Sequence, residues 1–124
     1  MLKIVYLSRN ISKIFNNQYV SSSYQQDVIN ELSNNSNLYN YGPGYKDFNI
    51  KDNLEDIIKK SSFNPDAIVF GHNWLSDDDN SNSISLMDDL SFKNLEIPKI
   101  LILNKEYVNL ERKLKYIKNV KFDF

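Results

Sequence analysis

The only histidine and the only tryptophan of the chain stand close together, in the segment Gly71-His72-Asn73-Trp74. Imidazole has an ordinary pKa of about 6.5, so a histidine can accept or release a proton near neutral pH. An indole ring can stack on a flat ligand, and an amide can donate and accept hydrogen bonds. We therefore take His72 as a candidate catalytic base and Asn73 and Trp74 as candidate substrate-binding residues. The alternatives are a structural histidine at a strand end and a tryptophan that belongs to the core.

A second polar group follows the first apolar run of the chain. Ser8, Arg9 and Asn10 come directly after residues 2–7 and are candidate substrate-binding residues. The Arg9 guanidinium could bind a phosphate or carboxylate through paired hydrogen bonds, or could be a hydrated loop arginine. A phosphate cradle needs glycines that let backbone N–H groups approach the anion. The loop that begins at Ser8 has none, which argues against a dinucleotide, P-loop or flavin site there.

A third candidate is the turn Tyr41-Gly42-Pro43-Gly44-Tyr45. Two glycines around a proline favour a tight backbone turn, and a tyrosine flanks it on each side. The rings of Tyr41 and Tyr45 could lie against the face of a sugar, with Gly42 and Gly44 allowing close approach. Turn chemistry alone also explains these residue types, so a simple connection between a strand and a helix is the alternative.

Composition excludes several classes of protein. The chain has 124 residues, a formal net charge of −1 and no cysteine. This length suits one domain over residues 1–124, and the charge gives no general attraction for nucleic acid. Neither a signal peptide nor an apolar run of membrane-spanning length is present, so we expect a cytoplasmic protein without a membrane span.

No cofactor or metal site is expected from the sequence. One histidine and no cysteine argue against zinc. Asp77-Asp78-Asp79, with Asp88 further on, is distantly similar to a calcium loop, but Asn82 stands where such a loop needs glycine. We therefore interpret these aspartates as part of a hydrated surface loop.

The elements that must position the candidates alternate along the chain. Apolar runs predict strands, helical spacing and capping residues predict helices, and the two kinds of element follow each other. The expected strands are residues 2–7, 38–41, 67–70, 99–103 and 120–124, and the expected helices are residues 21–33, 54–60, 84–90 and 107–117. This pattern predicts an α/β fold, a three-layer αβα sandwich around a five-stranded parallel Rossmann-like sheet.

The strand order decides whether the candidates meet. We favour the order 2-1-3-4-5, with 3-2-1-4-5 as the alternative. In the favoured order the chain reverses its direction of progress between strands 1 and 3, where open α/β sheets bind ligands. Residues 8–10 and 72–74 would then face each other across one crevice.

Two helices carry more detailed expectations. Asp52 and Glu55 have the spacing of a capping box for the helix at 54–60. Leu110 and Leu114, with Tyr107 and Ile117, have the spacing of a buried stripe on the last helix.

Three segments resemble the N-terminal, acceptor-side domain of GT-B glycosyltransferases, in a bacterial glycosyltransferase-like branch. They are Asn64-Pro65-Asp66-Ala67-Ile68-Val69-Phe70-Gly71-His72, Ile97-Pro98-Lys99-Ile100-Leu101-Ile102-Leu103 and the turn at 41–45. The resemblance implies a sugar or glycan acceptor bound by Ser8, Arg9, Asn10, His72, Asn73 and Trp74, with His72 as the base toward an acceptor hydroxyl. The glycine-rich first loop common in the family is absent.

The resemblance also implies a second domain for the nucleotide-sugar, and the chain stops at Phe124. We therefore expect no activity from this domain alone. Val120, Phe122 and Phe124 would leave an apolar strand edge, covered by a donor-domain partner chain or by self-association.

Two other functions compete with a glycosyltransferase domain. One is a non-catalytic α/β binding or assembly module. The other is a degenerate receiver-like domain. It is less favoured, because Gly71 and Ser8-Arg9 stand where a receiver domain needs acidic residues.

Overall fold

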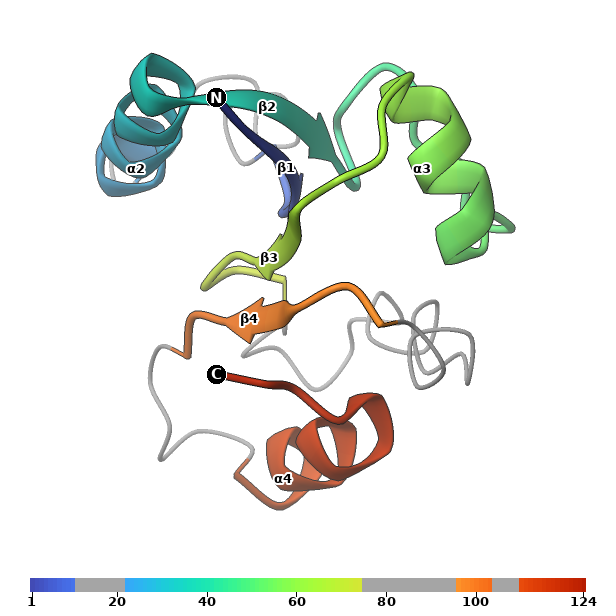
Figure 1. The fold of residues 1–124 in the computed structure, drawn as a ribbon. Coiled ribbons are helices and arrows are strands. Elements are labelled where there is room, and N and C mark those ends of the chain that lie inside the picture. The colour runs from blue at the N-terminus through green and yellow to red at the C-terminus, as the bar shows by residue number, and fades with distance from the viewer. Residues whose placement is uncertain (11–21, 75–95, 104–109) are drawn as a thin grey trace.

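The computed structural model of the protein describes residues 1–10, 22–74, 96–103 and 110–124 (Figure 1). Within these ranges the chain forms a mixed α/β fold around one parallel sheet. The strands are β1 (Leu2–Leu7), β2 (Ser36–Tyr41), β3 (Ala67–Phe70) and β4 (Lys99–Leu101). The helices are α2 (Ser22–Asn35), α3 (Leu54–Ser61) and α4 (Leu110–Val120). The expected helix at 84–90 and the aspartates at 77–79 and 88 lie outside the described residues.

The four strands stand in the order β2-β1-β3-β4, and all neighbours are parallel. Strand β1 is bonded to β2 on one side and to β3 on the other, with Leu7 opposite both Tyr41 and Phe70. This agrees with the favoured order as far as the fourth strand. The alternative 3-2-1-4-5 is wrong, because it would separate β1 from β3.

Strand β1 is buried on both faces, which explains its nearly continuous apolar sequence. Val5 and Leu7 belong to one apolar cluster, together with side chains of α3 and α4. Ile4 and Tyr6 belong to a second cluster, which includes Ile29 of α2. Helices therefore pack against both faces of the sheet, with α2 and α3 on opposite sides (Figure 1).

The expected fifth strand at 120–124 is not present. Val120 is the last residue of α4, and Lys121 ends the helix with a left-handed backbone (φ 59°). Of the alternating apolar residues, Val120 therefore belongs to the end of α4, and Phe122 and Phe124 belong to an irregular tail. The tail still runs beside β4 (Figure 1): Asp123 N donates to Lys99 O (2.9 Å), and Leu101 N donates to Phe124 O (3.0 Å).

Two phenylalanines of this tail have different surroundings. The ring of Phe122 lies edge-on to Phe70, with 4.7 Å between the ring centroids, and also contacts Tyr116. Phe124 is largely exposed. Phe122 thus packs against the apolar cluster around Phe70, and the tail is hydrogen-bonded to β4. The tail does not form an open apolar strand edge. Association of the protein through this segment stays a prediction.

The buried stripe expected on α4 is wrong. Leu110 and Leu114 are 45% and 55% exposed, and the buried residues are Lys113, Tyr116 and Val120. The helix is rotated so that the ring of Tyr116, rather than the leucines, packs against Phe70. A buried tyrosine hydroxyl needs a hydrogen-bond partner. Tyr116 has one in Trp74, which is far away in the sequence, so the spacing of apolar residues on the helix could not indicate it.

The cap of α3 also differs from the expectation. Asn53, not Asp52, begins the helix: its side chain accepts from Asp56 N (2.9 Å), and the Asp56 carboxylate accepts from Asn53 N (3.0 Å). Residue spacing alone fits either pair, since both are three apart. The cap at Asn53 leaves the carboxylate of Asp52 for another contact.

Two glycines stand where the sheet allows no side chain. A Cβ on Gly42, whose φ is +148°, would lie 1.8 Å from the carbonyl oxygen of Ser8. A Cβ on Gly71 would lie 2.6 Å from the hydroxyl oxygen of Tyr6. The turns after β2 and β3 are therefore packed directly against β1 and the residue that follows it.

We predict that Gly42→Ala lowers the free energy of unfolding by roughly 2 to 4 kcal/mol, because backbone must move to admit the methyl group. Gly44→Ala is the matched control. Gly44 also has positive φ (+88°) but is exposed, so Gly44→Ala should cost only about 1 kcal/mol. Urea denaturation measures both values. Equal losses for the two variants would contradict the contact between Gly42 and Ser8.

Candidate functional site

Three turns meet at the carboxyl ends of β1, β2 and β3. Gly71 N donates to Leu7 O (2.8 Å), which joins the turn after β3 to the end of β1. Ser8 N donates to Tyr41 O (3.0 Å), and Asn10 N donates to Pro43 O (2.8 Å). The segments 8–10, 42–45 and 71–74 are therefore neighbours, as expected for the favoured strand order.

Asn73 connects the first and third of these turns. Its Oδ1 accepts from Arg9 N (3.1 Å), and its Nδ2 donates to Arg9 O (2.9 Å). Both ends of the amide are thus used on the backbone of one residue 64 positions away. Asn73 fixes the distance between the two turns and has a structural role, whatever else it contacts.

Trp74 lies in the core. Its side chain is 3% exposed, its Nε1 donates to the Tyr116 hydroxyl (3.0 Å), and its ring meets Phe70 edge-on. A ring in this position has little face left for a ligand. The hydrogen bond to Tyr116 also explains why α4 turns that tyrosine, and not its leucines, toward the sheet.

The remaining candidates of these turns differ in exposure. His72, Arg9 and Asn10 are partly exposed, and so is Tyr45. Ser8 and Gly42 are buried, and Gly44 is exposed. Partly exposed polar residues at this edge therefore carry an imidazole, a guanidinium, amides and a phenol, although Nε of Arg9 is itself buried.

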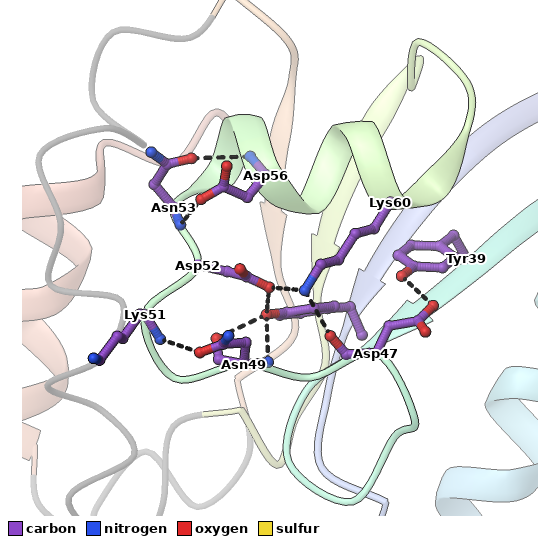
Figure 2. Close-up of polar contacts among 9 residues, drawn as sticks. Tyr39, Asp47, Asn49, Lys51, Asp52, Asn53, Asp56 and Lys60 are labelled. Atoms are coloured by element: carbon purple, nitrogen blue, oxygen red, sulfur yellow. Dashed lines mark hydrogen bonds and ion pairs between the residues drawn. The ribbon is translucent and has the colours of Figure 1, made fainter.

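Tyr41 lies apart from this edge, because its ring is completely buried and its hydroxyl reaches the loop before α3. The hydroxyl lies 2.5 Å from Asp52 Oδ2 and 3.0 Å from Asn49 O, and it accepts from Asn49 N (3.1 Å). Figure 2 shows Asn49 and Asp52, the two loop residues that make these contacts. The first tyrosine of the turn is thus an anchor of the loop.

Lys60 completes this polar cluster from the end of α3 (Figure 2). Its Nζ donates to Asp52 Oδ2 (2.5 Å) and to Asp47 O (2.9 Å), and it lies 5.9 Å from the centre of the Tyr41 ring. We call Tyr41, Asp52 and Lys60 the loop anchor. The anchor ties the loop that follows β2 to both ends of α3.

The loop anchor shifts the pKa values of Asp52 and Tyr41. Burial opposes the charge on Asp52, whose side chain is 10% exposed, but hydrogen bonds from Lys60 and Tyr41 and the charge of Lys60 lower its pKa. Burial, together with the hydrogen bond to Asp52, raises the pKa of Tyr41. The anchor is therefore a neutral phenol and an ammonium group around one carboxylate at neutral pH.

The sequence did not indicate the loop anchor. The spacing of Asp52 and Glu55 predicts a helix cap instead, and no sequence pattern connects Asp52 with Lys60. The one sequence feature that relates to this contact is the short loop between Tyr41 and α3, which keeps Asp52 near the Tyr41 hydroxyl. No fixed residue spacing identifies such a pair in a sequence.

Two absences can be stated for the described parts of the chain. No three acidic or histidine side chains there come together in a way that could hold a metal ion. No helix in those parts has the length and apolar character needed to cross a membrane.

Comparison with protein-family models, with curated proteins and with solved structures gives no match.

We predict that Asp52→Asn destabilises the protein by roughly 1 to 3 kcal/mol at pH 7, because Lys60 and Tyr41 lose a charged acceptor. The folded state lowers the Asp52 pKa, so the carboxylate stabilises the fold above about pH 4, and this contribution is lost as pH falls through the folded pKa. Wild type and variant should therefore converge in acid. Denaturation at several pH values measures this, with the exposed Glu55→Gln as control; a difference independent of pH would contradict it.

Proposed function

We propose that the protein binds a sugar or glycan acceptor at the carboxyl edge of β1 and β3, as the acceptor-side domain of a GT-B-type glycosyltransferase does. The observation that carries the proposal is the pair of hydrogen bonds between Asn73 and Arg9, which holds the turns after β1 and β3 side by side. This is the switch point of the sheet, where open α/β folds place their ligands.

The proposal assigns different roles to the candidate residues. His72, Arg9 and Asn10 contact the acceptor, since their side chains have access to solvent at this edge. His72 takes a proton from an acceptor hydroxyl, as the resemblance to the family suggests. Asn73 and Trp74 support the site without contacting the acceptor. Asn73 fixes the spacing of the turns, and Trp74 fills the core beneath them.

The absence of a glycine-rich loop after β1 also supports an uncharged acceptor over a phosphate-bearing donor. Only Arg9 among these contact residues carries a permanent positive charge. Sugar hydroxyls, in contrast, are well matched by amide, imidazole and phenol groups.

A non-catalytic binding or assembly module is the second candidate. It is favoured by the use of Asn73 and Trp74 for internal contacts, and by the exposure of Leu110, Leu114 and Phe124. This function requires no small-molecule ligand at the switch point, so ligand titration separates the two candidates.

We expect at least one free sugar or nucleotide-sugar to raise the melting temperature and to shift the amide resonances of Arg9 and His72 in an NMR titration. Removing one charged or polar contact with Arg9→Ala or His72→Ala should weaken that binding about tenfold.

Lys118→Ala, which removes a positive charge from the exposed end of α4, is the matched control and should bind as wild type does. Failure of every sugar and nucleotide-sugar to bind, or equal affinity of all variants, would contradict the proposal. Concentration-dependent self-association in sedimentation would then favour the assembly module.

A further inference from the structure

Ser8 has a buried hydroxyl without a hydrogen-bond partner among the described residues. It is the first residue after β1, it is 0% exposed, and its backbone N–H donates to Tyr41 O (3.0 Å). A buried hydroxyl that lost its water without gaining a partner costs free energy. Such a group at a ligand-binding edge is a position where a ligand hydroxyl would be accepted.

The turn after β2 packs against the backbone of Ser8 and Asn10. Gly42 lies against the carbonyl of Ser8, Asn10 N donates to Pro43 O, and Tyr45 N donates to Gly42 O (3.0 Å). The turn is thus bonded on both sides of Ser8, so Tyr45 at its end is held beside that residue.

The side chain of Tyr45 lies beside that of Ser8. Its hydroxyl is near enough to the Ser8 hydroxyl to lower the Tyr45 pKa, while burial, the larger effect, raises it. The contact does not satisfy the Ser8 hydroxyl. Tyr45 is partly exposed and lies in the turn after β2, outside the strands of the sheet.

We propose that Ser8 forms the floor of a small subsite that Tyr45 closes, and that the Ser8 hydroxyl binds one hydroxyl of a sugar when Tyr45 turns outward. The ring of Tyr45 then lies against the sugar face. This subsite rests on the proposed function, because it lies within the same edge, and it adds a specific hydroxyl contact and a moving part to it.

The absence of cysteine from the chain makes the closure measurable with a single introduced thiol. Ser8→Cys is nearly isosteric and should react slowly with a maleimide reagent. Adding Tyr45→Ala should speed the reaction roughly tenfold or more, whereas Tyr45→Phe, which keeps the ring, should leave it slow.

Val5→Cys reports on global opening, because Val5 is completely buried in the central strand. Its labelling should not change when Tyr45→Ala is added. An equal acceleration at Val5 and Ser8, or no acceleration at Ser8, would overturn the closure by Tyr45.

The ligand contact is tested with glucose, galactose and N-acetylglucosamine as probes. Ser8→Ala removes only the hydroxyl and should weaken the binding of the sugar that wild type accepts by about tenfold. If that sugar binds wild type and Ser8→Ala equally, the subsite is wrong while the proposed function stands. If none of the sugars binds wild type, both fall.

Discussion

The close approach of Gly42 to the carbonyl oxygen of Ser8 is the contact on which the carboxyl edge of the sheet depends. It brings the turn after β2 onto the residue that follows β1, and it leaves no room for any side chain between them. Trp74 also lies close to this glycine, with its Cζ3 atom 3.2 Å from the position of an added Cβ. Three turns from distant parts of the chain therefore share one small volume, and their hydrogen bonds follow from that proximity.

The polar residues around these turns fall into two groups, those with internal partners and those that are partly exposed. Asn73 uses its whole amide on the backbone of Arg9, and Trp74 directs its N–H to Tyr116 in the core. On the opposite side of the turn, the loop anchor of Tyr41, Asp52 and Lys60 ties residues 42–52 to α3. His72, Arg9 and Asn10 are partly exposed beside these internal contacts. If this edge binds an acceptor as proposed, its rigid support would lower the entropic cost of binding.

The sheet could largely be predicted from the sequence, and its borders could not. Apolar runs identify β1 and β3 because both strands are buried on two faces. The failures arise where one pattern fits two structures: the alternation at 120–124 also suits the end of α4 and a tail, and the spacing of Leu110 and Leu114 also suits an exposed face. The deciding factor at α4 is the bond between Tyr116 and Trp74, which joins residues 42 positions apart and leaves no local trace.

The proximity of the turns after β1 and β3 could also be predicted from the sequence, since adjacent parallel strands bring their carboxyl ends together. The roles of the residues in these turns could not. Nothing in the sequence tells whether an asparagine will bind a ligand or a distant backbone, and both Asn73 and Trp74 proved to have internal partners. The sequence predicts a sugar-binding ring at Tyr41 and a helix cap at Asp52. In the structure the two side chains hydrogen-bond to each other and anchor a loop.

The association of the three turns is the central claim, and amide hydrogen exchange at Arg9 and Asn10 tests it most directly. Both residues lie beyond β1, so a free loop would leave their N–H groups open to water. Bonded to Asn73 Oδ1 and to Pro43 O, these amides should exchange slowly, with protection close to that of the neighbouring Ser8 amide. Exchange of Arg9 and Asn10 at the rate of an unprotected peptide would show that the turns are not joined, and would contradict the account.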